Sequence, residues 1–162
     1  MDKAQEDAGS KRARILVVDD HAVVREALTK LVEAESDLAV CGEAENAAKA
    51  LEAVEKQQFD LAIVDIAQAG ASGVELIEKL RSRSPRMVVI MLSMHDGPLY
   101  AQRALKAGAA GYVAKYEAAE KIITAIRQVL AGGIYVSDSR LGRPISGDPS
   151  VSGDGREPNN SG

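Results

Sequence analysis

Aromatic residues, cysteine and long apolar runs are all scarce in this 162-residue sequence. It has no tryptophan and one phenylalanine, so a core must come from aliphatic side chains, which the 46% share of hydrophobic residues supplies. The only cysteine, Cys41, cannot form an internal disulfide and is interpreted as a small buried residue of a strand. No run approaches the ~18 apolar residues of a membrane span, and the polar start of the chain lacks the apolar segment of a signal peptide. We therefore expect a soluble, cytoplasmic protein.

A surplus of positive charge is also missing. The chain has 20 Lys and Arg against 24 Asp and Glu, which gives a net charge of -4 at pH 7. Nucleic acids and anionic membranes attract basic surfaces, so this balance argues against direct binding of either partner.

Strand-like apolar runs alternate with stretches of helical periodicity. The strand runs begin near Arg14, Leu38, Leu61, Met87 and Ala110. Helices are expected from the capping residue Asp20 through Leu31, over about 46–57, from Ser72 to near Pro85, over about 98–106 and over about 117–131. Such an alternation, with strands rich in Val, Ile and Leu, predicts a parallel sheet covered on both faces. We therefore expect an α/β, flavodoxin-like doubly wound sheet of five parallel strands, in the order 2-1-3-4-5, with five helices.

The composition divides the chain into three parts. Residues 1–12 are polar and are predicted to form a flexible N-terminal segment, while residues 13–137 carry the alternation and are interpreted as one domain. Residues 138–162 are rich in Ser, Gly, Pro, Asn and Asp, and we predict a flexible linker or tail there.

Three carboxylates stand at the ends of two predicted strands. Asp19 and Asp20 close the first apolar run, and Asp65 closes the third. In the expected order these strands are neighbours at the switch point, where α/β sheets bind ligands beyond the carboxyl ends of their strands. Clustered carboxylates cannot all ionise without a cation, and a set of oxygen ligands suits Mg²⁺ better than zinc. The sequence therefore predicts a magnesium site.

Residues 14–137 resemble the receiver domain of two-component response regulators. The acidic pair is followed, in order and at the spacing of that family, by Asp65, a hydroxyl at Ser93, an aromatic ring at Tyr112 and Lys115. Four fragments are most similar to the NarL/FixJ-like subfamily, whose receivers precede a LuxR-type helix-turn-helix: Asp19-Asp20-His21, Leu92-Ser93-Met94-His95-Asp96, Ala107-Gly108-Ala109-Ala110-Gly111-Tyr112 and Gly132-Gly133-Ile134-Tyr135-Val136-Ser137.

The resemblance implies a signalling switch and not an enzyme. Asp65 would be the phosphoacceptor, taking a phosphoryl group from a sensor histidine kinase or a phosphotransfer protein. The ligands implied for Mg²⁺ are Asp20 and Asp65 directly, Asp19 through water and the backbone carbonyl of Ala67.

Lys115, Ser93 and Tyr112 would bind the phosphoryl group or respond to it. Lys115 would contact it as a mobile cation, and Ser93 would donate a hydrogen bond to it. Ser93 and Tyr112 together would form the switch, with homodimerisation or transcription as the output. The residues after Ser137 lack the periodicity of a helix-turn-helix, so we expect DNA contact only through an output domain absent from this chain, whether the protein is a receiver with a tail or a cut chain.

Each residue also has a simpler structural interpretation. The acidic pair could be a turn and a helix cap, Asp65 a turn former, Ser93 a loop hydroxyl, Lys115 a solvated cation and Tyr112 a packed core residue. Their combination at matching strand ends favours the functional interpretation. His21 and His95 are isolated and stand where histidine is ordinary, in the first turn of a helix and in a surface loop, so neither is predicted to bind a metal.

The loop after Asp65 departs from the family pattern. Gln68-Ala69 stands where the family usually has Met-Pro, which removes a fixed φ angle and an apolar anchor. Two other functions stay open, the first because of this loop and the second because a similar sheet can carry it with Asp65 or Asp19 as nucleophile. One is a pseudo-receiver that binds partners without phosphotransfer. The other is a magnesium-dependent phosphatase, which the lack of an Asp-x-Asp motif after any strand disfavours.

Overall fold

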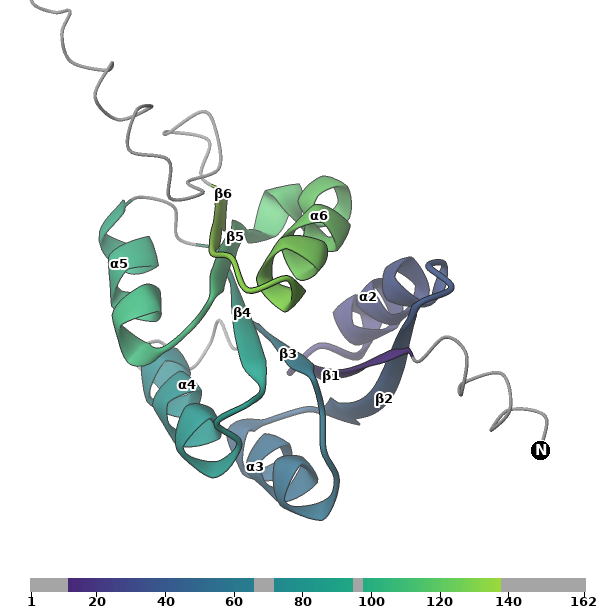
Figure 1. Cartoon of the computed structure of the whole chain (residues 1–162), viewed down its shortest axis with the longest axis horizontal. Coiled ribbons are helices and arrows are strands. Elements are labelled where there is room, and N and C mark those ends of the chain that lie inside the picture. Colours follow the sequence, from purple (N-terminus) through teal and green to yellow (C-terminus); the bar gives the residue numbers. More distant parts are fainter. Residues whose placement is uncertain (1–11, 66–71, 95–97, 138–162) are drawn as a thin grey trace, which may run out of the picture.

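Figure 1 shows the computed structural model, which describes residues 12–65, 72–94 and 98–137. The strands of this part are β1 (Ala13–Asp19), β2 (Leu38–Ala44), β3 (Leu61–Asp65), β4 (Val88–Ser93), β5 (Gly111–Ala114) and β6 (Tyr135–Ser137). Its helices are α2 (Ala22–Glu33), α3 (Ala47–Lys56), α4 (Ser72–Arg83), α5 (Pro98–Ala107) and α6 (Ala118–Leu130), and a short 3₁₀ helix, η2 (Lys115–Glu117), joins β5 to α6. The predicted alternation of strands and helices is confirmed, and the bounds lie within a few residues of those expected.

The described strands form one parallel sheet in the order β2-β1-β3-β4-β5-β6. The first five follow the predicted flavodoxin-like order, but the sheet has a sixth strand, so the expectation of five was wrong. In β6, Tyr135 pairs with Gly111 and Ser137 pairs with Val113. The sequence pattern missed β6 because three residues are fewer than the roughly four to eight that reveal a strand by their apolar run.

β6 is fixed at the edge of the sheet by more than its pairing with β5. All three of its residues are buried. In addition, the Ser137 hydroxyl donates a hydrogen bond to the side chain of Glu117, which lies in η2. The final strand is thereby joined to the turn that follows β5.

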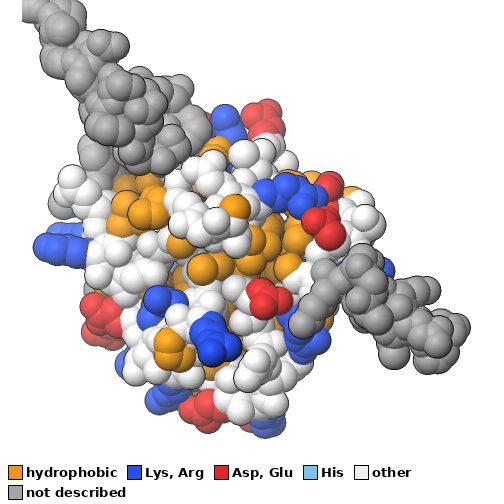
Figure 2. All heavy atoms as spheres, viewed as in Figure 1, with side chains coloured by type: hydrophobic (Ala, Val, Ile, Leu, Met, Phe, Trp, Pro, Cys, Tyr) orange, Lys and Arg blue, Asp and Glu red, His pale blue; other side chains and the backbone are white. Residues whose placement is uncertain are grey.

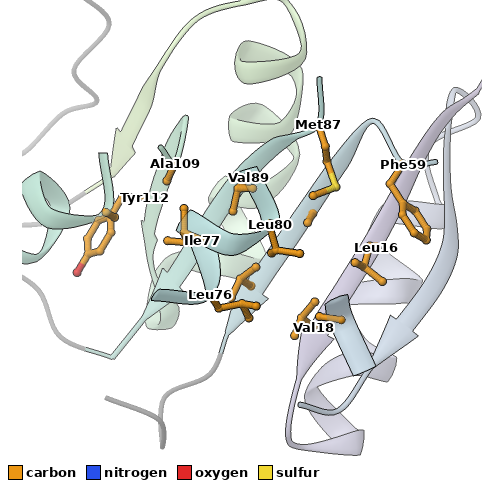
Figure 3. Close-up of a cluster of buried hydrophobic side chains, with 14 of the residues drawn as sticks. Leu16, Val18, Phe59, Leu76, Ile77, Leu80, Met87, Val89, Ala109 and Tyr112 are labelled. Carbon is orange, nitrogen blue, oxygen red and sulfur yellow. The ribbon is translucent and has the colours of Figure 1, made fainter. Parts of the chain in front are cut away.

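Helices cover both faces of the sheet. Figure 1 shows α2 and α6 on one face and α3, α4 and α5 on the other. Successive strand residues alternate between the two cores: Ile15 packs toward α2 and α6, and Leu16 toward the opposite face. In the second core, the aliphatic side chains lie between Phe59 at one end and Tyr112 at the other (Figure 3). The predicted aliphatic core is confirmed.

The ends of the helices show one difference from the sequence analysis. Asp20 was expected to cap the first helix, but α2 begins at Ala22 and its N-cap residue is His21, whose side chain makes no capping bond. Gly108 directly follows α5, with a φ of 116° that L-residues rarely adopt. Cys41 lies in β2 as predicted, although its side chain is only half-buried.

The surface carries charges of both signs. On the face in Figure 2, Lys and Arg side chains alternate with Asp and Glu around exposed apolar groups, without a broad region of one sign. Among the helices of the described residues, none is both long and apolar enough to cross a lipid bilayer.

Candidate functional site

The carboxyl ends of β1 and β3 bring two acidic side chains together. These strands are neighbours, and Asp19 stands opposite Asp65 in their register. Both side chains have no solvent-accessible surface. Each strand is buried on both faces up to its last residue, so the chain places a charged group where the apolar run ends. A pair of fully buried acids is energetically unfavourable and therefore indicates a functional site.

Lys115 supplies a positive charge to this pair. It is the first residue of η2, directly after β5, and its Nζ atom lies 2.9 Å from Asp65 Oδ2. The side chain is 20% exposed, so the ammonium group stands between the buried carboxylate and solvent. Because β4 separates β3 from β5 in the sheet, this side chain reaches across the end of β4 to make the ion pair.

The environment perturbs the proton affinity of both partners. Burial, followed by the adjacent Asp19 carboxylate, raises the pKa of Asp65 to about 7, although Lys115 acts to lower it. Burial alone would lower the pKa of Lys115, but the neighbouring carboxylates, Asp65 first among them, hold that pKa above its ordinary value. Near neutral pH, Asp65 is therefore close to the midpoint of its titration while Lys115 is cationic.

The residues that follow β1 form a second group of contacts. The His21 backbone N–H donates to Asp19 Oδ1 at 2.8 Å, and Arg25 Nη1 donates to the Asp19 carbonyl at 2.7 Å. The His21 ring turns the same way: its Nδ1 lies 2.9 Å from Asp20 Oδ1 and 3.4 Å from Asp19 Oδ1. No function was predicted for His21, because in the sequence it is an isolated histidine at the start of a helix. The orientation of its ring depends on α2 beginning at Ala22.

The predicted magnesium ligands can be tested for their fit to a cation. Asp19 Oδ2 and Asp65 Oδ1 are buried and have no hydrogen-bond donor among the described residues, whereas Asp65 Oδ2 has the Lys115 ammonium group 2.9 Å away. Buried polar atoms are normally satisfied, so Asp19 Oδ2 and Asp65 Oδ1 call for water or an ion. Asp20, at the same edge, is 23% exposed and gives access from solvent. The oxygens present thus fit a hard divalent cation.

The other predicted residues lie around this centre or outside the described part. Ser93 ends β4, is 5% exposed and pairs with Ala114, the residue before Lys115. Tyr112 lies two residues earlier in β5 with its ring fully buried (Figure 3). Ala67, Gln68-Ala69 and His95 belong to segments outside the described residues, so the predicted backbone ligand and the altered loop have no structural test.

Comparison with known proteins identifies the family that has this arrangement. A family model for the response regulator receiver domain matches residues 15–127, a range that contains Asp19, Asp65 and Lys115. The chain belongs to the response regulator receiver family. The resemblance to receiver domains of two-component systems that was inferred from the sequence is thus confirmed.

Curated relatives of this receiver are regulators of transcription. It is 34% identical over 131 residues to the transcriptional regulatory protein DegU of Brevibacillus brevis, an alignment that covers 81% of this chain and 56% of DegU. It is also 34% identical over 124 residues to the transcriptional regulatory protein UhpA of Escherichia coli K12, covering 76% of this chain and 61% of UhpA. The receiver therefore spans about three fifths of the length of these relatives.

Solved structures similar to this chain include receivers of LuxR-family response regulators. A two-component response regulator of the LuxR family from Aurantimonas superposes with a TM-score of 0.73 at 31% identity, covering 81% of this chain and 93% of that one. The signal receiver domain of NarL from Mycobacterium tuberculosis gives a TM-score of 0.68 at 30% identity, covering 75% and 98%. The likeness to receivers of LuxR-type regulators is confirmed.

Proposed function

We propose that this receiver accepts a phosphoryl group on Asp65 from a phosphohistidine of a sensor histidine kinase or a phosphotransfer protein. One observation carries the proposal: the buried Asp65 carboxylate stands beside Asp19 and 2.9 Å from the Lys115 ammonium group. A nucleophile, a cation and free acidic oxygens at the ends of neighbouring strands are the parts that phosphoryl transfer requires.

The chemistry follows from these parts. An ionised oxygen of Asp65 attacks the phosphorus, the P–N bond of the phosphohistidine breaks, and its electron pair returns to the imidazole nitrogen. The product is an acyl phosphate. Lys115 is placed to turn from the carboxylate to the incoming phosphate oxygens as a mobile cation. When bound by Asp19, Asp20 and Asp65, Mg²⁺ would neutralise charge on the transferring oxygens.

The output and location follow from the relatives. Since those relatives are transcriptional regulators, we propose that phosphorylation controls transcription in the cytoplasm. DNA would be bound by an output domain beyond these residues, and homodimerisation on phosphorylation is the route by which the receiver would act on it.

Labelling with acetyl phosphate tests the proposal. The full chain, incubated with acetyl phosphate and Mg²⁺ and measured by intact mass spectrometry, should gain one labile phosphoryl group. Asp65→Asn should remove the adduct, because the amide is not a nucleophile. Asp60 is exposed and lies at the opposite end of β3, so Asp60→Asn offers a control. EDTA should abolish labelling of the parent.

Two outcomes would change the assignment. Full labelling of Asp65→Asn would show that another residue is the acceptor. A folded parent that never gains a phosphoryl group, from acetyl phosphate or from a phosphorylated kinase, would instead favour the pseudo-receiver, to which the Gln68-Ala69 loop first pointed.

A further inference from the structure

Asp19 and Asp20 are successive residues, yet their carboxylates lie close together. In an extended strand, successive side chains point to opposite faces of the sheet. Here one carboxylate oxygen of Asp19 and one of Asp20 lie within 4.8 Å of each other. β1 ends at Asp19 and the chain bends at Asp20, so the peptide unit between the two residues sets the relative direction of their side chains.

Arg25 holds this peptide unit. Its Nη1 atom donates to the Asp19 carbonyl at 2.7 Å, and that carbonyl is the oxygen of the peptide unit. Because a peptide unit is planar, a bond to its oxygen also limits the orientation of its N–H side, which belongs to Asp20. Arg25 lies near the start of α2, and its side chain is only 17% exposed, so water competes little for this donor.

Glu43 holds the guanidinium group from another direction. Its Oε1 atom accepts a hydrogen bond from Arg25 Nε at 3.3 Å. Glu43 lies in β2, and the pairing of β2 with β1 ends one residue later, where Ala44 stands opposite Val18. The planar guanidinium group, with two of its donors bound to different partners, therefore connects β2 to the end of β1 beyond the last strand pair.

These contacts leave one oxygen of Asp19 for the site. The carbonyl accepts from Arg25, and Oδ1 accepts from the His21 N–H at 2.8 Å. Oδ2 is buried and has no donor among the described residues. The backbone and one carboxylate oxygen are thus fixed, and the remaining oxygen has a set position. A group that is already ordered loses less entropy when it binds a ligand.

We propose that Arg25, oriented by Glu43, is a positioning residue of the phosphoacceptor site, which acts through the Asp19 carbonyl to keep the carboxylates of Asp19 and Asp20 together. The inference rests on the proposed function and adds to it a residue that acts through the backbone. A cation this close to two acids could instead be a counter-ion. The two roles predict opposite effects, because loss of a counter-ion would strengthen Mg²⁺ binding and loss of a positioning residue would weaken it.

The magnesium dependence of labelling separates these roles. The full chain, Arg25→Gln and Arg25→Lys would be labelled with acetyl phosphate over a range of Mg²⁺ concentrations and measured by intact mass. We expect both variants to need about tenfold more Mg²⁺ for the half-maximal rate, and to recover most of the parent rate at saturating Mg²⁺. Lysine keeps the charge but lacks the planar pair of donors. Lys30→Gln, at an exposed cation of the same helix, should leave the half-maximal concentration unchanged.

Two further measurements test how Arg25 acts. In EDTA, Arg25→Gln should shift the amide resonances of Asp20 and His21 and leave those of α4 in place, because the effect is local to the bend. Glu43→Ala should raise the half-maximal Mg²⁺ concentration, since it frees one side of the guanidinium group. Glu45→Ala removes the same charge two residues later, at a side chain that is 55% exposed, and should not raise it.

The results decide between named alternatives. A half-maximal Mg²⁺ concentration that falls in Arg25→Gln would overturn the proposal and make Arg25 a counter-ion. An Arg25→Lys variant equal to the parent would overturn it as well, because charge alone would then suffice. If Arg25→Gln is not folded, as judged by its amide spectrum, equal behaviour of Glu43→Ala and Glu45→Ala would overturn it. All of these results include a parent that is labelled, whereas a parent that never gains a phosphoryl group would contradict the proposed function itself.

Discussion

Replacing Asp65 by asparagine should stabilise the fold at neutral pH when divalent cations are absent. The folded state raises the pKa of Asp65 from 3.8 to about 7. Between these values the unfolded chain has lost the proton while the folded chain still holds it, so the free energy of unfolding falls as the pH rises. This contribution to stability is fully present below about pH 4 and is lost as the pH passes through about 7. Asparagine has no charge to desolvate and avoids the loss.

The size of the effect can be bounded from the site. One pKa unit corresponds to about 1.36 kcal/mol, so a shift from 3.8 to about 7 sets a ceiling of about 4 kcal/mol. Two features reduce it. The raised pKa reflects the interaction of Asp65 with Asp19 and is not a property of Asp65 alone. The variant also leaves the Lys115 ammonium group without the carboxylate 2.9 Å away, although the Lys115 side chain reaches solvent. We expect a gain of about 1–3 kcal/mol at pH 8.

Urea unfolding in EDTA from pH 4.5 to 8 measures this gain. The difference between Asp65→Asn and the parent should grow up to about pH 7 and then stay constant. Glu78→Gln, an exposed site on α4, removes the same charge and should show no such trend. If Mg²⁺ binds the proposed site, which exists only in the folded state, it should stabilise the parent and narrow the difference in unfolding free energy between the two proteins. A variant less stable than the parent at pH 8, or a difference independent of pH, would refute the reasoning.

Two further predictions concern the switch and the core. Ser93→Ala should still be phosphorylated, because Asp65 keeps its surroundings, but the variant should lose most of the amide shifts that beryllofluoride induces in α5 and β5 of the parent. Amide shifts equal to those of the parent would exclude a path through Ser93 and Tyr112. Leu80→Ala, at a fully buried site of α4, should lower the free energy of unfolding by about 2–5 kcal/mol, whereas Lys79→Ala, at the exposed adjacent position, should change it by less than about 0.5 kcal/mol. A similar small loss for both variants in urea titrations would contradict the assigned core.

The sequence predicted the parts of the structure that have a strong periodic pattern. Strands buried on both faces read as unbroken Val, Ile and Leu, and α6 repeats its apolar residues with the period of a helix, so both were placed closely. The meeting of Asp19 and Asp65 was also predictable, since adjacent parallel strands that end in acids bring those acids to one edge.

Other features could not be predicted, because they depend on very short segments or on contacts between residues distant in the sequence. β6 has three residues and is held by contacts with β5 and Glu117 that no local pattern reveals. The orientation of His21 depends on α2 starting at Ala22, and helix boundaries are the least certain part of any sequence-based prediction. The roles of Ser93 and Tyr112 remain predictions, because they concern a change between two states.

The direction of β6 determines where the chain leaves the sheet. β6 runs parallel to β1 and β3, so Ser137 ends at the same edge as Asp19 and Asp65, with its hydroxyl bonded to the turn that begins with Lys115. Any module joined after residue 137 is thus tethered beside the acidic edge and not at the opposite pole. A short flexible tether corresponds to an effective concentration of about the millimolar range. Contacts too weak to form between separate molecules could therefore form within one chain and, under the proposed function, compete with a kinase for access to Asp65.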